Sequence, residues 1–421
     1  MIEADLLVHS AGQLLTLAGG PQRGQDLGRL AMIEDGALAI HQGRITAVGK
    51  TGEIRGCVRA QHEIDADGSV VMPGFVDPHT HLLWAGDRAA EFEMRLAGKT
   101  YLEILAAGGG ILSTVRATRA ASVEELLAET RPRIRKMLAH GTTTAEAKTG
   151  YGLETGAELR MLDALLRLKT EGPLDIIPTF LGAHAVPPEY EGRSDAYTEY
   201  VCQEMLPAVR RWWLEHAGDL NLPFVDVFCE RGAFNLEQSR RILHIARSLG
   251  FGLKIHADEF ESLGGTRLAA ELGATSADHL VHTRQADIEA LGQATTAAVA
   301  LPCTPFGLAE SAYSPARALI EAGALLALAS DLNPGTAWCE SMQFVIALAC
   351  RYLRLTPAQA IAAATINAAA AVGLADQVGS LEPGKRADVL ILEVNNYRHL
   401  GYRFGTNLVS TVIRAGRVVV Q

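Results

Sequence analysis

Two histidines one residue apart, His79 and His81, lie in the segment Asp77-Pro78-His79-Thr80-His81. The apolar residues before them predict a β-strand over residues 75–81, and side chains two apart on a strand point to the same side. Both imidazoles can therefore reach one metal ion through neutral nitrogen atoms, at about 2.0–2.1 Å. Taken alone, such a pair is equally compatible with a metal site and with two incidental histidines near a turn.

His256 and Asp331 extend this candidate ligand set. His256 lies in KIHADE and Asp331 ends the run LALASD, so both occupy the ends of predicted strands. A lone aspartate before a loop is usually a turn former, and a lone histidine in a strand is usually a core residue. Their coincidence at the same end of separate strands favours a metal site, and nitrogen and oxygen donors of this kind suit Zn²⁺ or Fe²⁺.

Eight short apolar or β-branched runs alternate with helical stretches through the middle of the chain. We predict strands at Phe75–His81, Thr142–Lys148, Ile176–His184, Val225–Glu230, Gly252–Asp258, Ser276–Leu280, Ala297–Pro302 and Leu325–Asp331, and amphipathic helices such as Val123–His140, Leu236–Leu249 and Pro315–Glu321. This alternation predicts an α/β fold of the (β/α)₈ barrel type, with an open doubly wound sheet as the alternative. All strand C-termini of a barrel meet on one face, which would bring the candidate ligands together.

The two ends of the chain are strand-rich instead. Leu38–Gly49 has apolar runs on both sides of Gln42-Gly43, which predicts a hairpin, and Ile64–Met72 predicts a further strand. Strand–turn–strand patterns return after about residue 380. We therefore predict a small β-sandwich domain built from both termini, residues 1–72 and 380–421, with the barrel, residues 73–379, inserted between them.

Composition excludes several classes of protein. The 421 residues include 48 acidic and 38 basic side chains, a net charge of −10, so the chain is a poor general binder of nucleic acid. No run reaches about 18 apolar residues, so we expect no membrane span. Glu3 and Asp5 stand where an export signal would be positively charged. The six cysteines form no CxxC pair, which favours reduced thiols and a cytoplasmic location.

Longer motifs resemble a known family. VMPGFVDPHTH, KIHADE, ADHL and ASDLNPG are similar to the amidohydrolase superfamily of metal-dependent hydrolases. More narrowly, RLAGKTYLEILAAGGGILSTV, HGTTTAEAKTGYGLE, PTFLGAHAVP, VDVFCERGAF and SDLNPGT resemble the imidazolonepropionase family, over nearly the whole chain. The resemblance implies hydrolysis of the ring amide C–N bond of 4-imidazolone-5-propanoate, which gives N-formimino-L-glutamate in L-histidine degradation.

The resemblance also implies the metal site. One ion per chain, Zn²⁺ or iron (Fe²⁺ or Fe³⁺), is expected on His79, His81, His256 and Asp331. Many superfamily members hold two ions on a carboxylated lysine at the end of strand four. Here that strand ends Phe228-Cys229-Glu230, without a lysine, which points to a single ion. Glu230 could bridge two ions, but a hydrogen-bonding role in the barrel is the favoured interpretation.

Amide hydrolysis needs a base for the water nucleophile and a proton donor for the leaving nitrogen. Glu259 is the first choice for the general base, Asp331 is a second proton acceptor, and His279 could polarise the carbonyl or stabilise the oxyanion. The structural alternatives are an acid at a helix N-terminus for Glu259 and a buried core histidine for His279.

The resemblance further implies six residues in contact with the substrate, namely Arg88, Tyr151, His184, Asn333, Gly335 and Thr336. Arg88 suits the propanoate because a guanidinium can bind a carboxylate through two parallel hydrogen bonds. A deaminase or another ring hydrolase of the superfamily is the alternative enzyme, and a metal-stabilised scaffold without activity is the alternative outside enzymes. Arg88 and Tyr151 favour a small anionic substrate, and a homodimer is the expected assembly.

Overall fold

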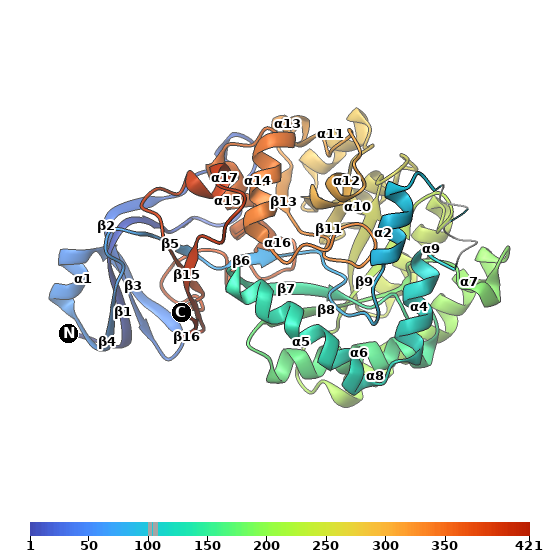
Figure 1. Ribbon diagram of the computed structural model, residues 1–421, viewed down its shortest axis with the longest axis horizontal. Helices are drawn as coiled ribbons and strands as arrows, with labels where there is room; N and C mark the ends of the chain where they lie inside the picture. The colour runs from blue at the N-terminus through green and yellow to red at the C-terminus, as the bar shows by residue number, and fades with distance from the viewer. Residues whose placement is uncertain (100–102, 104–107) are drawn as a thin grey trace.

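The computed structural model describes residues 1–99, 103 and 108–421. The chain has two parts, a sheet that holds both termini and a barrel surrounded by helices (Figure 1). Part of the motif RLAGKTYLEILAAGGG, quoted above, lies outside the described residues.

The barrel contains eight parallel strands in sequence order. They are β6 (Phe75–Asp77), β7 (Thr142–Lys148), β8 (Asp175–Ala183), β9 (Phe224–Cys229), β10 (Gly252–Ala257), β11 (Ser276–His279), β12 (Ala297–Ala300) and β13 (Leu325–Leu328). The barrel closes beyond β6 and β13, where Thr80 bridges Leu332 and the Asp331 amide donates to the His79 carbonyl at 3.1 Å. This closure confirms the barrel and excludes the open sheet.

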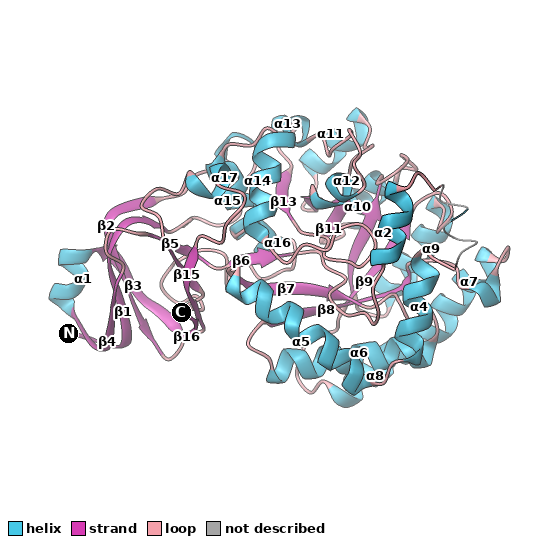
Figure 2. Ribbon diagram, in the orientation of Figure 1, coloured by secondary structure: helices cyan, strands magenta, loops and turns pink. Residues whose placement is uncertain are grey.

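Helices cover the outside of the barrel (Figure 2). They are α2 (Ala89–Leu96), α4 (Ile111–Ala120), α5 (Val123–Ala139), α6 (Thr155–Glu171), α7 (Ser194–Tyr200), α8 (Leu206–His216), α9 (Leu236–Ser248), α10 (Gly265–Leu272), α11 (Gln285–Gln293), α12 (Cys303–Gly307), α13 (Ala316–Glu321), α14 (Met342–Tyr352), α15 (Pro357–Ala363) and α16 (Ile366–Ala370). Capping boxes at Ser122, Asn235 and Thr356 fix where α5, α9 and α15 begin.

The second part is one mixed sheet drawn from both chain ends. It contains β1 (Ile2–Leu15), β2 (Met32–His41), β3 (Arg44–Lys50), β4 (Val58–Asp65), β5 (Val70–Pro73), β14 (Val389–Leu392), β15 (Val409–Arg414) and β16 (Arg417–Val420), with helix α1 (Thr51–Cys57) after β3. The sheet curls back on itself, because the Ile45 amide donates to Lys385 O and the Ala387 amide donates to Gly43 O. It thereby encloses an apolar core of its own, around Leu14, Leu38 and Ile413.

Two details differ from the sequence prediction. The strand predicted over Ile64–Met72 is divided between β4 and β5, because the chain turns at Asp67-Gly68, where both residues have positive φ. The segment 380–421 also contributes to the barrel side, since α17 (His399–Tyr402) packs on α14 and the Arg351 side chain donates to Gly401 O at 2.8 Å. The hairpin at Gln42-Gly43 and all eight barrel strands are present, with ends that differ from those predicted by a few residues at most.

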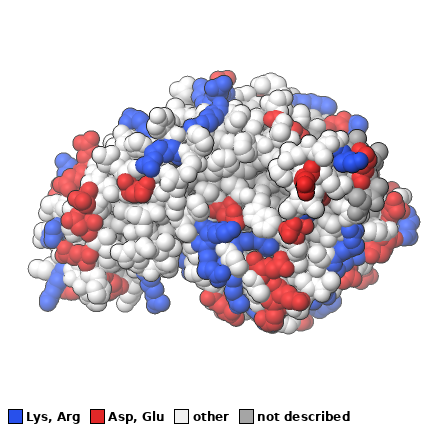
Figure 3. Space-filling model, in the orientation of Figure 1, with Lys and Arg blue, Asp and Glu red and all other residues white. Residues whose placement is uncertain are grey.

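Basic and acidic side chains lie next to one another over α5 and α6 on the face shown in Figure 3. Arg167 illustrates this mixing, because it pairs with both Glu124 and Asp163. Among the described residues, no helix combines the length and the hydropathy that a membrane crossing requires.

Two glycines that follow helices offer a matched test of packing between the barrel and the sheet. Gly141 (φ 94) follows α5 and Gly250 (φ 90) follows α9, so both backbones are left-handed. A Cβ on Gly141 would lie 2.9 Å from Leu390 Cδ1 of β14, whereas the nearest described atom to a Cβ on Gly250 would be 3.7 Å away. We expect Gly250→Ala to cost about 1–2 kcal/mol of stability through backbone strain alone. Gly141→Ala should cost about 1–3 kcal/mol more through overpacking.

Thermal unfolding of the two variants beside the parent protein measures this difference. Equal losses of Tm would contradict the claim that Leu390 packs tightly on the α5–β7 turn.

Candidate active site

Four predicted ligand side chains converge where β6, β10 and β13 end. His79 Nε2 and His81 Nε2 lie 3.5 and 3.6 Å from Asp331 Oδ1, and His81 Nε2 lies 3.3 Å from His256 Nε2. His79 Nε2 and Asp331 Oδ1 are buried and have no hydrogen-bond partner among the described residues. Buried polar atoms without partners are costly, and a cation held between these atoms would satisfy them. The donor set therefore fits one metal ion.

Two buried aspartates lie beside two of the three imidazoles of the candidate ligand set. Asp278 Oδ2 lies 2.6 Å from His79 Nδ1, and Asp226 Oδ2 lies 3.0 Å from His256 Nδ1. A carboxylate at Nδ1 holds the proton there and leaves the lone pair of Nε2 free to bind a metal. Burial lowers the pKa of His79 and of His81 well below the usual histidine value, and the neutral imidazole is the form that binds metals.

Lys148, at the end of β7, balances these carboxylates. Its Nζ lies 2.7 Å from Asp226 Oδ2, 2.6 Å from Glu146 Oε1 and 3.9 Å from Asp278 Oδ2. Burial alone would lower the pKa of Lys148, but Asp226 and Glu146 outweigh burial and raise it. Lys254 adds a second buried cation 4.0 Å from Asp278. Cations and carboxylates thus compensate one another inside the barrel, as buried charges must.

The backbone departs from ordinary strand geometry at the site. His279 (φ 78) and Asp331 (φ 54) are left-handed although neither is glycine, a conformation that costs about 1–3 kcal/mol per residue. Hydrogen bonds hold both residues, from Ser314 Oγ to His279 O at 2.6 Å and from Thr304 Oγ1 to Asp331 Oδ2 at 2.5 Å. These left-handed turns direct the two side chains across the end of the barrel.

Glu259 and His279 lie beside the ligand cluster. Glu259 Oε2 is 3.6 Å from His279 Nε2, and neither ring nitrogen of His279 has a hydrogen-bond partner in the described part of the chain. Burial, reinforced by the nearby Asp331 carboxylate, raises the pKa of Glu259 well above the usual value. Helix α10 begins only at Gly265, which argues against a helix N-terminal role for Glu259. The side chain of Glu230 accepts from the Phe260 and Glu261 amides at 2.9 and 3.2 Å, and so positions the loop that carries Glu259.

Every predicted site residue except His79, which lies beneath, lines one cavity of about 140 Å³. The lining consists of His81, Arg88, Ile111, Tyr151, His184, Phe228, His256, Glu259, Phe260, His279, Asp331, Asn333, Gly335 and Thr336. Most of this lining is polar, and Ile111, Phe228 and Phe260 form its apolar part. The size of the cavity suits a small ring rather than a polymer.

Arg88, in the lining of this cavity, is paired with Glu91. Its Nε donates to Glu91 Oε2 at 2.8 Å and its Nη2 donates to Glu91 Oε1, while Glu91 also accepts from the Gly110 amide at 2.8 Å. A Cβ on Gly335 would overlap Arg88 Nη1, so a larger residue there would displace the end of the guanidinium. Glu91 thus fixes the direction of Arg88 and leaves Nη1 facing the loop of Gly335.

The other predicted contact residues differ in the hydrogen bonds that they already make within the protein. Asn333 Oδ1 accepts from the Gly335 and Thr336 amides, both at 2.8 Å, so its amide mainly shapes the loop after β13. His184 donates from Nδ1 to Gly150 O at 3.0 Å and stacks on His81 at 4.8 Å between ring centroids. Burial lowers the pKa of His184 to about 3 and raises the pKa of Tyr151. Both side chains are therefore neutral groups for a ligand to meet.

Sequence reasoning missed the supporting residues, although a signal for them existed. Lys148, Asp226, Lys254 and Asp278 are charged residues within the strands of the barrel, and all four are fully buried. Charges at such positions are rarely tolerated without partners. Glu91 gave no such signal, because it lies on an ordinary charged helix.

Comparison with known proteins agrees with this geometry. The amidohydrolase family profile matches residues 70–419. An adenosine deaminase of Xanthomonas campestris with bound zinc superposes with a TM-score of 0.70 at 20% identity, covering 100% of this chain and 93% of that one. The guanine deaminase of E. coli superposes with a TM-score of 0.72 at 17% identity, covering 99% of both chains. The chain belongs to the amidohydrolase family.

Relatives with much higher sequence identity belong to one kind of amidohydrolase. The imidazolonepropionase of Herpetosiphon aurantiacus is 54% identical over 419 residues, covering 100% of this chain and 98% of that relative. The imidazolonepropionase of Chloroflexus aggregans is 52% identical over 424 residues, covering 100% and 99%. Within the amidohydrolases, these full-length relatives of the chain are thus imidazolonepropionases.

Replacing Asp278 by Asn tests the orienting role of the buried carboxylates. The variant keeps the size of the side chain but no longer holds the proton on His79 Nδ1 by charge, so we expect metal affinity to fall about 10–100-fold. Competition with a chelator, followed by metal analysis, measures this affinity. Asp376→Asn, at an exposed position, is the matched control, and an Asp278→Asn variant that binds metal as tightly as this control would contradict the assignment.

Proposed function

We propose that this chain is an imidazolonepropionase that hydrolyses the ring amide C–N bond of 4-imidazolone-5-propanoate to N-formimino-L-glutamate. The observation that carries the proposal is one small cavity that combines a His–Asp ligand cluster with a buried glutamate and an arginine. The full-length relatives support the same activity. A deaminase is the rival, but Arg88 in the lining of the cavity favours a substrate with a carboxylate over a neutral base.

In this proposal His79, His81, His256 and Asp331 hold one divalent cation. Such a cation lowers the pKa of bound water towards about 7 and so supplies a nucleophile at neutral pH. Burial raises the pKa of Asp331 to about 6, and a neighbouring cation favours the carboxylate form that a ligand needs. The end of β9 supplies no lysine for a second ion, and the Oε2 of Glu230 already accepts two backbone amides.

Glu259 and His279 perform the proton and charge chemistry. Burial raises the pKa of Glu259 well above the usual carboxyl value, so this side chain can hold a proton taken from water and return it to the leaving nitrogen. His279, with both ring nitrogens free of partners among the described residues, is placed to steady the oxygen of the carbonyl as it gains charge. Arg88 holds the propanoate, while Tyr151, His184, Asn333, Gly335 and Thr336 surround the ring.

The proposal also covers the identity of the ion, the cellular location and the assembly of the protein. The ion is Zn²⁺ or iron, since imidazole and carboxylate ligands suit both. A reducing, cytoplasmic location fits six cysteines that are all free, and we expect a homodimer.

The activity is tested by adding 4-imidazolone-5-propanoate to the purified protein and following the loss of its ultraviolet absorbance. We expect turnover that a chelator abolishes, with the far-ultraviolet circular dichroism unchanged because the barrel has its own core. Turnover of a purine or pyrimidine base, without turnover of the imidazolone, would favour the deaminase instead.

Glu259→Gln should change activity and stability in opposite directions. We expect kcat to fall by about 10²–10⁴-fold with metal content retained, because the general base is lost. Because burial raises the pKa of Glu259 in the folded state, that state binds the proton more tightly than the unfolded chain. The contribution of Glu259 to the stability of the parent protein therefore falls as pH rises from about 4.3, the unfolded value, through the folded pKa.

The glutamine introduced by Glu259→Gln cannot ionise, so the variant escapes this loss of stability. With metal removed from both proteins, the Tm of the variant should exceed that of the parent at about pH 8, and the difference should vanish below about pH 4. A Tm difference that is independent of pH, or an unchanged kcat, would remove Glu259 from the mechanism.

Arg88 is expected to determine substrate choice. Arg88→Ala should lower kcat/KM for the imidazolone at least about tenfold, and Arg88→Lys should restore it only in part, because lysine lacks the planar fork. The control substrate is an imidazolone without the carboxylate, which the parent should turn over poorly and the Ala variant no worse. If both substrates suffer equally, Arg88 serves only to pair with Glu91.

A further inference from the structure

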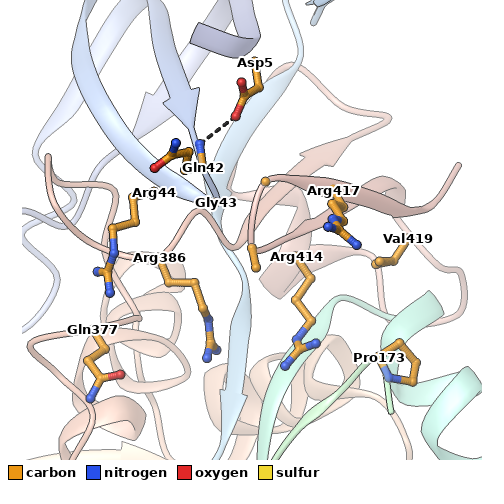
Figure 4. Close-up of a pocket in the computed structure, with 12 residues that line it drawn as sticks. Asp5, Gln42, Gly43, Arg44, Pro173, Gln377, Arg386, Arg414, Arg417 and Val419 are labelled. Carbon is orange, nitrogen blue, oxygen red and sulfur yellow. Dashed lines mark hydrogen bonds between the residues drawn. The ribbon is translucent and has the colours of Figure 1, made fainter. Parts of the chain in front are cut away.

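A second cavity, of about 840 Å³, lies at the junction of the sheet and the barrel (Figure 4). Its walls include the turn between β2 and β3, the turn between β15 and β16, and barrel residues Pro173 and Gln377. Pro173 precedes β8, so the cavity is at the amino-terminal ends of the barrel strands. The candidate active site is at the opposite ends of these strands, and it does not account for this cavity.

The two turns give the cavity a fixed rim. Gln42 and Gly43 have φ values of 49° and 75°, and Ala415 and Gly416 have 46° and 77°, as expected for two-residue hairpin turns of type I′. A Cβ on Gly43 would lie 2.9 Å from Ala415 O. The two turns are therefore packed directly against each other, and this contact fixes their positions.

Four arginines line this cavity in a chain of net charge −10, namely Arg44, Arg386, Arg414 and Arg417. Figure 4 shows Arg386 and Arg414 extending side by side, with Arg44 on one side and Arg417 on the other. Arg386 is already neutralised, because it bonds Asp175 Oδ2 at 2.5 Å and Asp388 Oδ2 at 2.6 Å. Arg386 therefore lines the cavity but has no uncompensated charge to offer a ligand.

The other three guanidiniums make few hydrogen bonds within the described part of the chain. Arg44 donates from Nη1 to Gly384 O at 2.7 Å, and Arg414 makes one long contact, from Nη1 to Gly172 O at 3.5 Å. The Nε of Arg414 is buried without a hydrogen-bond partner in the described part of the chain. The side chain of Arg417 is exposed and has no hydrogen bond or ion pair with any described residue. Burial, and then repulsion from Arg386, lowers the pKa of Arg414.

Negative charge among the described residues of the lining is limited to Asp5. Its Oδ2 accepts from the Gln42 amide at 2.6 Å, and its Oδ1 lies 3.2 Å from His41 Nδ1. Asp5 is thus committed to the β2–β3 turn. The cavity presents three guanidiniums with spare donors against one carboxylate that is already engaged.

We propose that this cavity binds a small polyanion with two or more phosphate or carboxylate groups, held by Arg44, Arg414 and Arg417. Guanidiniums match such oxyanions because they offer paired donors in a plane. A ligand there would contact the sheet and the barrel together, and a ligand that binds only the folded state stabilises it. Since the site lies at the far end of the barrel, we expect binding to raise Tm without changing kcat.

Isothermal titration calorimetry at constant ionic strength tests the proposal with two probes. Sulfate represents a phosphate group and is a weak metal ligand, and tricarballylate represents a polycarboxylate. We expect at least one probe to bind the parent protein with a Kd below about 1 mM. Loss of one charge-assisted contact should weaken binding about tenfold or more in Arg414→Gln and Arg417→Gln.

Two further variants serve as controls. Arg59→Gln removes the same charge from an exposed position on β4, and Arg88→Gln removes the arginine of the candidate active site. Both should bind the probe as the parent does. Because Arg417 is exposed, its variant keeps the test valid even if Arg414→Gln fails to fold.

The proposal is overturned if neither probe binds the parent, or if all variants bind equally, which would indicate general charge screening. It is also overturned if Arg88→Gln alone loses binding, because the probe would then occupy the active site.

Discussion

Two carboxylates buried inside the barrel, Asp226 and Asp278, hold the imidazoles of His256 and His79 in the candidate metal site. A buried charge without compensation costs several kcal/mol, so these carboxylates require Lys148 and Lys254 beside them. The four residues lie on four different strands, β7, β9, β10 and β11. A parallel barrel is the architecture that brings them to one level, and the site therefore depends on the closed sheet rather than on any single loop.

The same site contains buried polar groups and residues with a strained backbone. Left-handed residues at the ends of β11 and β13 direct His279 and Asp331 inward, while Glu259 is kept where burial opposes its ionisation and raises its pKa. Each feature lowers stability, and the large apolar core around the barrel offsets them. Arg88 is also fixed in advance, because its pairing with Glu91 sets the guanidinium before any substrate arrives.

Much of the fold and of the candidate site could be predicted from the sequence, for physical reasons. The eight barrel strands could be predicted because their apolar runs are separated by clear helical stretches, and their ends carried the polar residues that meet in the cavity. The predicted strand Phe75–His81 is shorter than expected, since regular pairing stops at Asp77 and only Thr80 bridges further on. The Arg88–Glu91 pair and the curl of the sheet depend on contacts that the apolar and polar pattern of a single segment does not encode.

The proposed function depends above all on one metal ion held by His79, His81, His256 and Asp331. Diffraction from crystals of the protein as isolated, recorded on both sides of the absorption edges of zinc and iron, tests this assignment most directly. We predict one anomalous peak per chain, in contact with these four side chains and with no others of the chain. Two peaks, or a single peak bound through Glu230 or His279 in place of one of the four, would contradict it.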